Sequence, residues 1–146
     1  MSLANLIGIS LEAIEPDRAT IRRLLSAAER NIADAHAGNV SNETRFDAAY
    51  KAIMQLANAA LQANGYRTLT NRPGHHMTLM QALNLTIGLD RNTIIVLDVL
   101  RKQRNDSDYF GDTIPATSMA DCVSHAEKLN SEVLSWMEAN KPELLE

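Results

Sequence analysis

The chain has 146 residues, of which 45% are apolar and 22% charged, as expected for one globular domain rather than a disordered protein. It has 14 Lys and Arg against 18 Asp and Glu, so the net charge is 14 − 18 = −4. This excludes a polybasic, histone-like nucleic-acid binder but allows a local basic patch. Ala and Leu supply about a quarter of the residues and aromatics only 4%, which favours helices over strands.

The first half of the chain predicts two long helices. Residues 1–16 are expected to form an arm or a short helix. Apolar residues then recur with helical spacing from about Asp17 to Ala37, and Gly38 can end that helix. A second helix is expected from about Asn42 to Asn64, with Ser41 or Asn42 as its N-cap. Its apolar stripe is expected to consist of Phe46, Ala49, Tyr50, Ile53, Ala57, Ala60 and Leu61. Because the linker between these helices is short, we expect them to be antiparallel neighbours.

The second half predicts three more helices. A loop over 66–76 is expected to lead into a short helix over 77–87. A fourth helix, capped by Asp90, is expected over 91–104, and its apolar residues nearly all round the circumference predict that it is the central helix. A polar loop over 105–117 precedes a last helix that ends near residue 140.

These elements predict an all-α fold, an antiparallel up-and-down bundle of four main helices plus one short helix. Residues 17–140 form the single domain, and 141–146 form a C-terminal tail.

The lone cysteine, Cys122, lies on the apolar stripe of the last helix and is expected to fill core. It excludes an internal disulfide and a zinc-cysteine cluster. No apolar run approaches the ~20 residues that span a bilayer, and the N-terminus lacks the pattern of a signal peptide. We therefore expect a cytoplasmic protein that does not interact with membranes.

Familiar catalytic motifs are absent from the sequence, including a Gly-rich phosphate loop and paired zinc-binding histidines. The pair His75-His76 is the only histidine cluster, and adjacent side chains point apart, which is unfavourable for a metal. We expect no metal site and no cofactor, with this pair helping to start the third helix.

Arg104 is the first candidate for a functional residue. It follows Leu97 and Leu100 at positions i, i+3 and i+7, so it continues their inward stripe. An arginine there needs a carboxylate, a backbone carbonyl or an anion. The alternative is that Arg101, Lys102 and Arg104 are favoured simply because cations stabilise the C-terminal end of a helix.

A second basic cluster, Arg18, Arg22 and Arg23, lies on the first helix. It could contact nucleic acid. Because Glu15 and Asp17 are close in sequence, a solvated helix face is the favoured interpretation.

Several segments, taken in order, resemble the HEPN family of helical nucleotide-binding domains, over roughly residues 17–136. The resemblance rests on Arg45–Tyr50, Leu56–Leu61, Gly65–Arg67, Gly74–His76 and Leu100–Tyr109. Its sharpest part is Arg104-Asn105 followed by Tyr109. The resemblance implies a helical bundle, a homodimer, RNA or a nucleotide as ligand, and an antitoxin-like protein partner in some systems.

Many members of that family are metal-independent RNases whose catalytic arginine is followed, after four to six residues, by a histidine. In this sequence Tyr109 stands where the histidine is expected. Tyrosine, with a pKa near 10, is a poor base at neutral pH, although it can donate a hydrogen bond or stack on a base. The resemblance implies Arg104 and Tyr109 as catalytic candidates. It implies a nucleotide- or RNA-binding set of Arg101, Lys102, Arg104, Asn105 and Tyr109.

Three functions are compatible with these residues. The first is a catalytically weak or inactive module that binds RNA or nucleotide at a dimer groove. The second is a metal-independent endoribonuclease of toxin–antitoxin or defence type, which a histidine from another element, His75 or His76, would favour. The third is a protein-interaction bundle in which a carboxylate holds a buried Arg104.

Overall fold

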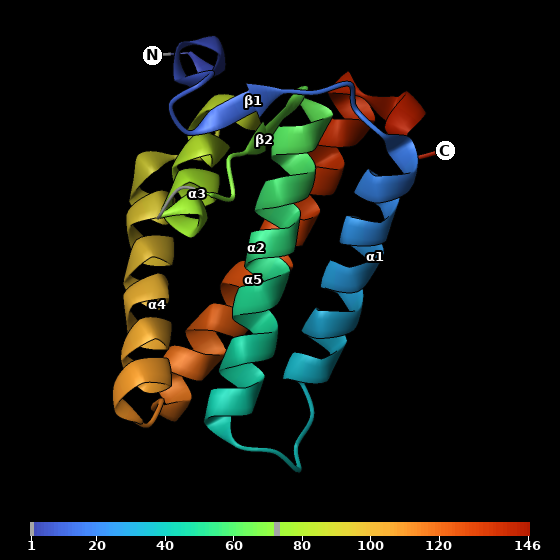
Figure 1. The fold of residues 1–146 in the computed structure, drawn as a ribbon. Helices are drawn as coiled ribbons and strands as arrows, with labels where there is room; N and C mark the ends of the chain where they lie inside the picture. The colour runs from blue at the N-terminus through green and yellow to red at the C-terminus, as the bar shows by residue number, and fades with distance from the viewer. Residues whose placement is uncertain (1, 72–73) are drawn as a thin grey trace.

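The computed structural model of the protein describes residues 2–71 and 74–146. Within these residues the chain is mostly helical, as predicted, with five α-helices and one small two-stranded sheet (Figure 1). The α-helices are α1 (Arg18–Ala35), α2 (Asn42–Ala63), α3 (His75–Thr86), α4 (Arg91–Phe110) and α5 (Ala116–Asn140). The strands are β1 (Leu11–Ala13) and β2 (Tyr66–Thr68), and 3-10 helices cover Leu3–Leu6 and Pro142–Leu144. The up-and-down order of an antiparallel bundle stays a prediction.

Two helix starts follow directly from local sequence. The Ser41 hydroxyl accepts a hydrogen bond from the Thr44 backbone N–H at 3.1 Å and so caps α2. The Asp90 carboxylate accepts from the Thr93 backbone N–H at 2.8 Å and caps α4. Both side chains satisfy backbone donors that have no partner within the helix, and both caps were predicted.

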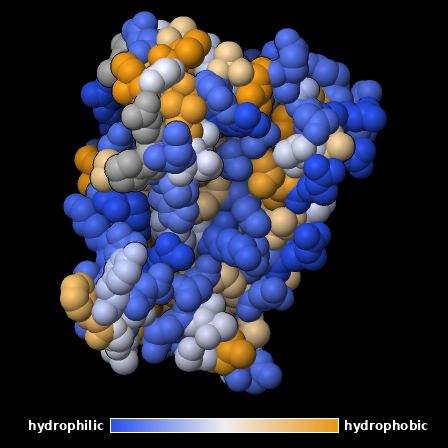
Figure 2. Space-filling model, in the orientation of Figure 1, coloured by the Kyte–Doolittle hydropathy of each residue, from blue (hydrophilic) through white to orange (hydrophobic). Residues whose placement is uncertain are grey.

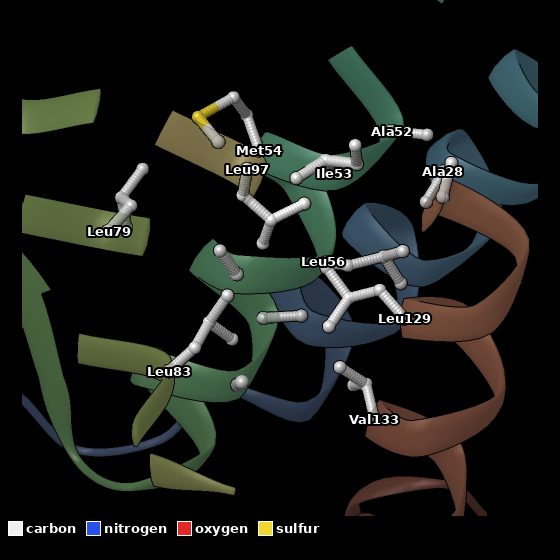
Figure 3. Packing of buried hydrophobic residues seen from close by; sticks show 14 of the residues in the cluster. Ala28, Ala52, Ile53, Met54, Leu56, Leu79, Leu83, Leu97, Leu129 and Val133 are labelled. Carbon is white, nitrogen blue, oxygen red and sulfur yellow. The ribbon is translucent and has the colours of Figure 1, made fainter. Parts of the chain in front are cut away.

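The central helix is α2, not α4. It packs against α1, α3, α4 and α5, and its buried residues extend along its whole length. Figure 3 shows Ile53 and Leu56 of α2 among side chains from the surrounding helices, such as Leu129 and Val133 of α5. The apolar stripe predicted for this helix is confirmed.

The prediction that the fourth helix is central is wrong. Only Leu97 and Leu100 of α4 are buried, whereas Ile95 is 62% and Val99 is 50% exposed. The helix lies at the edge of the molecule (Figure 1). The prediction failed because the apolar content of a helix does not determine which of its sides packs against other helices.

Part of the predicted 66–76 loop is a strand. Strand β2 pairs antiparallel with β1, with Leu11 opposite Thr68, and Leu11 is fully buried. Strands of three residues are too short for an alternating pattern to reveal them. Helix α3 begins at His75, earlier than predicted, and residues 72 and 73 of the predicted loop lie outside the described residues. The N-terminal segment contains both a short helix and an extended strand.

Helix α4 continues past its predicted end at Arg104 to Phe110. Gly111, with φ at 70°, provides the left-handed conformation that ends it. Residues 105–110 are mostly polar, but none of them breaks a helix, so polarity alone gave the wrong boundary. Among the described helices, none combines the length and apolar character needed to cross a membrane.

Candidate functional site

A pocket of about 560 Å³ opens between α2, α3 and the C-terminal half of α4. Six of its lining side chains are titratable: Asp47, Tyr50, Lys51, His75, His76 and Arg104. They come from three helices that are distant in sequence, and α2 contributes three of them. Figure 2 shows this face of the molecule, where hydrophilic residues gather over α2.

Tyr50 forms the inner wall of the pocket. Its ring is almost completely buried, and its hydroxyl shares a hydrogen bond of 3.2 Å with Nδ1 of His76. Burial raises the pKa of Tyr50 to about 12, so the phenol keeps its proton at neutral pH. Burial also lowers the pKa of His76, and the neighbouring His75 adds to that effect. His76 is therefore a neutral imidazole at neutral pH.

Arg104 reaches the pocket across the face of Tyr50. Its guanidinium carbon lies 5.1 Å from the centre of that ring, within range of a cation–π interaction. Its Nε lies 3.4 Å from Oδ2 of Asp108, and the arginine side chain is 33% exposed. Such a long, partly solvated pair is weak. Arg104 is therefore held in place by an aromatic ring and retains donors that can reach a ligand.

The remaining charges at the pocket are Lys51 and Asp47. Lys51 is exposed, and within residues 2–71 and 74–146 no carboxylate lies within 4.0 Å of its amine. Desolvation raises the pKa of the Asp47 carboxyl, and the negative charge of Asp108 adds to this. The pocket therefore combines two permanent cations with a carboxyl group that is less readily ionised than usual.

Only Arg104 of the residues predicted for the site lies in this pocket. Tyr109 is 80% exposed. Because α4 continues as a helix, the five residues from Arg104 to Tyr109 rotate the side chain by about 500°, which places it about 140° away. Tyr109 therefore faces solvent on another side of α4.

The other predicted residues are also outside the pocket lining. Arg101 Nε pairs with Asp98 at 2.8 Å, and Lys102 Nζ lies 3.3 Å from the same carboxylate. Asn105 is half-buried and does not line the pocket. Arg101 and Lys102 thus share a local carboxylate partner within α4. The interpretation that they stabilise the C-terminal end of the helix is wrong, because α4 continues to Phe110 and its last turn has no basic residue.

Sequence reasoning did not identify Tyr50 and Lys51 as site residues. It treated His75-His76 as a helix start and as the histidine source that would favour a nuclease. Tyr50 was expected in the core with its hydroxyl bonded at the rim, and it is buried with its hydroxyl at the edge of the core beside α3. Nothing in the spacing of residues within one helix could show that Tyr50 and His76 meet. The sequence signal that could have indicated this contact was a single tyrosine on an alanine-rich apolar stripe. A hydroxyl buried there needs a hydrogen-bond partner from another element.

The arrangement is suited to an anion. A planar guanidinium, a lysine amine and imidazole N–H groups are the donors that bind phosphate oxygens. In the described part of the chain, no group of three or more His, Cys, Asp or Glu residues could hold a metal ion.

No protein-family model matches the chain, and no curated protein matches it in sequence. The HEPN resemblance therefore stays a prediction.

We predict that His76 makes stability depend on pH. Its pKa in the folded state is lowered, so the unfolded chain binds more protons and the free energy of unfolding falls as pH drops below about 6.5. Replacing His76→Gln removes this titration and should flatten the fall. Urea denaturation at several pH values from about 7.5 to 5.5 measures it.

His125→Gln is the matched control, because His125 lies on α5 away from the pocket. It should leave the pH dependence of stability as in the wild type. An unchanged pH profile in His76→Gln would contradict the prediction.

Proposed function

We propose that the pocket binds the phosphate of a nucleotide or of RNA. The observation that carries this proposal is the convergence of Arg104, Lys51 and two histidines from three different helices on one pocket. A protein with a net charge of −4 gathers these donors at one site against its overall charge. That gathering favours an anionic ligand over an apolar one.

Each donor has a distinct part in this proposal. Arg104, positioned over the Tyr50 ring, offers two parallel N–H donors to a phosphate. Lys51 adds a mobile point charge at the rim. His76 has one N–H to donate as a neutral imidazole, and the Tyr50 hydroxyl fixes the orientation of its ring. The half-buried rings of His75 and His76 line the pocket and provide aromatic surface on which a base can stack.

We predict that Arg104→Ala weakens nucleotide binding by roughly 10- to 100-fold, the loss expected for a charge-assisted hydrogen-bonding group. Asp108→Asn should strengthen binding, because it removes the carboxylate that pairs with Arg104. Isothermal titration calorimetry with nucleoside monophosphates and diphosphates measures both changes.

Arg91→Ala is the matched control. Arg91 is an exposed arginine at the opposite end of the same helix, so its loss changes net charge equally without touching the pocket. If Arg91→Ala and Arg104→Ala reduce affinity alike, only the overall charge matters and the pocket proposal fails.

A metal-independent endoribonuclease is the second candidate, favoured by the presence of His75 and His76 in the pocket that holds Arg104. RNA cleavage of this type joins the 2′-oxygen to the adjacent phosphorus and breaks its bond to the 5′-oxygen. One group must accept the 2′-hydroxyl proton, and His75, in the same pocket, would donate a proton to the leaving 5′-oxygen. His76 can accept the proton at Nε2 when its Nδ1–H donates to the Tyr50 hydroxyl oxygen. Arg104 would stabilise charge on the phosphate.

We predict that, if the protein is a nuclease, it cleaves RNA in the presence of EDTA and leaves 2′,3′-cyclic phosphate ends. His76→Ala should then reduce the rate by roughly 100-fold or more, as for loss of a general base, while Tyr109→Phe leaves it unchanged. Denaturing gels of labelled RNA measure this. The absence of cleavage across structured and single-stranded RNAs would reject the nuclease and leave binding as the function.

The homodimer is a further part of this proposal. On α4, Ile95, Val99, Lys102, Asp106 and Tyr109 follow one another at intervals of three or four residues and form one stripe. Three of these residues are large, exposed and hydrophobic. If the same helix of a second copy packs antiparallel about residue 104, Lys102 faces Asp106 and Val99 faces Tyr109 in both directions. Such self-complementarity favours a second copy over an antitoxin-like protein as the occupant.

This dimer leaves the two pockets separate. Arg104 lies on the side of α4 that faces away from the stripe. It follows Ile95 by nine residues, which rotates its side chain by about two and a half turns around the helix axis, to the opposite side. A dimer formed through the stripe would therefore carry one pocket on each copy rather than a single groove lined by both arginines.

We predict that Val99→Glu converts the dimer to a monomer, because it places a charge in the centre of the apolar contact. Val40→Glu is the control, since Val40 is also exposed but lies in the linker between α1 and α2. Size-exclusion chromatography with light scattering measures the mass of each. A wild-type protein that is monomeric at micromolar concentration would reject the dimer.

A further inference from the structure

The pocket adjoins a second hollow between α2 and α1. Lys51 and Gln55 line the pocket and also line the adjoining hollow on α2. Arg30 and Asn31 of α1 form the other side of that hollow, and Asn31 Nδ2 donates a hydrogen bond of 2.8 Å to Gln55 Oε1. The two helices therefore form a continuous floor beside the pocket.

The hollow continues along α1. Arg30 also lines a third depression, together with Arg22 and Arg23. The three depressions share lining residues at each junction, so they form one path from Arg23 through Arg30 and Lys51 to Arg104. We call this path the basic groove.

The groove is positively charged although the protein is acidic. Its permanent cations are Arg22, Arg23, Arg30, Lys51 and Arg104, and its carboxylates are Asp34 and Asp47. The balance is 5 − 2 = +3 within a chain whose net charge is −4. A local excess of this size concentrates polyanions on one face.

Most cations of the α1 and α2 parts of the groove remain available. Arg23 donates to the Thr20 hydroxyl at 3.0 Å, and Arg22 donates to the backbone carbonyl of Glu146 at 2.9 Å. In the part of the chain that the structure describes, no carboxylate side chain lies within 4.0 Å of Arg22, Arg23, Arg30 or Lys51. The charges of Arg23, Arg30 and Lys51 are therefore not neutralised by local ion pairs, whereas Arg22 is already held by the main-chain oxygen of Glu146.

We infer that the basic groove binds an extended single-stranded nucleic acid, with its phosphates along Arg23, Arg30 and Lys51 and one nucleotide in the Arg104 pocket. The inference rests on the proposed function and extends it from a single nucleotide to a polynucleotide. Grooves that track a backbone with cations and hold bases against aromatic surfaces are the usual design for single strands. The His75 and His76 rings in the pocket favour a nucleic acid over an acidic peptide, which has no bases to stack.

The test measures affinity against oligonucleotide length. Fluorescence anisotropy uses labelled single-stranded oligouridylates of roughly 2, 4, 8 and 12 nucleotides. Affinity should rise with length until the groove is filled. The double variant Arg23→Ala/Arg30→Ala should bind the longest strand about 10-fold more weakly. The slope of its plot of log K against log salt concentration should be smaller in magnitude by about 1.4, because each lost phosphate contact removes about 0.7.

The same double variant should bind a uridine mononucleotide as the wild type does, because neither arginine lines the pocket. Arg104→Ala should weaken binding of every length. The control is Arg91→Ala, combined with Lys128→Ala to remove two exposed charges outside the groove. Circular dichroism checks that each variant is folded. Matched oligodeoxyuridylates show whether the 2′-hydroxyl contributes to binding.

Three results would overturn the inference while leaving the proposed function intact. The first is an affinity that does not change with oligonucleotide length. The second is a control variant whose binding of long strands is weakened as much as that of the groove variant. The third is polyglutamate that competes as well as oligouridylate of the same charge. Failure of all nucleotides and oligonucleotides to bind would instead reject the proposed function itself.

Discussion

The rest of the structure depends on the burial of α2 among four other helices. This helix carries alanines at many of its contact positions, and Ala49, Ala52, Ala59 and Ala60 are all fully buried. Small side chains allow neighbouring helix axes to approach closely, so α1, α3, α4 and α5 can all contact the same helix. Burying this much apolar surface in one continuous cluster is the main favourable contribution to folding.

The candidate site forms where that burial ends. Tyr50 belongs to the core, while Lys51, the next residue, faces solvent, because successive residues of a helix point about 100° apart. A phenol at this boundary has an apolar body inside and a hydroxyl that needs a partner, which α3 supplies through His76. Arg104 then lies over the face of the same ring. One buried aromatic residue therefore brings together groups from three helices.

The position of α4 at the edge of the molecule gives it two separate surfaces. The side that packs inward presents Leu97 and Leu100 to the core and Arg104 to the pocket. The opposite side exposes apolar residues such as Ile95 and Val99. An edge helix can thus take part in ligand binding and in self-association without one competing with the other, because the two surfaces lie on opposite sides of its axis.

The sequence by itself determined the helical class, the caps at Ser41 and Asp90, and the inward stripes of α1, α2 and α5. These features depend on residues within one or two turns of each other, where helical spacing and side-chain hydrogen bonds act directly. It also identified Arg104 as a residue that requires a partner.

Only the tertiary structure decided which helix is central, where β1 finds β2, and which groups join Arg104. Those outcomes depend on contacts between residues far apart in the chain, such as Tyr50 with His76 and Asn31 with Gln55. The spacing of residues within one helix carries no information about such long-range contacts. The separation of Tyr109 from Arg104 has the same origin, because it follows from α4 continuing to the helix-ending Gly111 rather than from the identity of either residue.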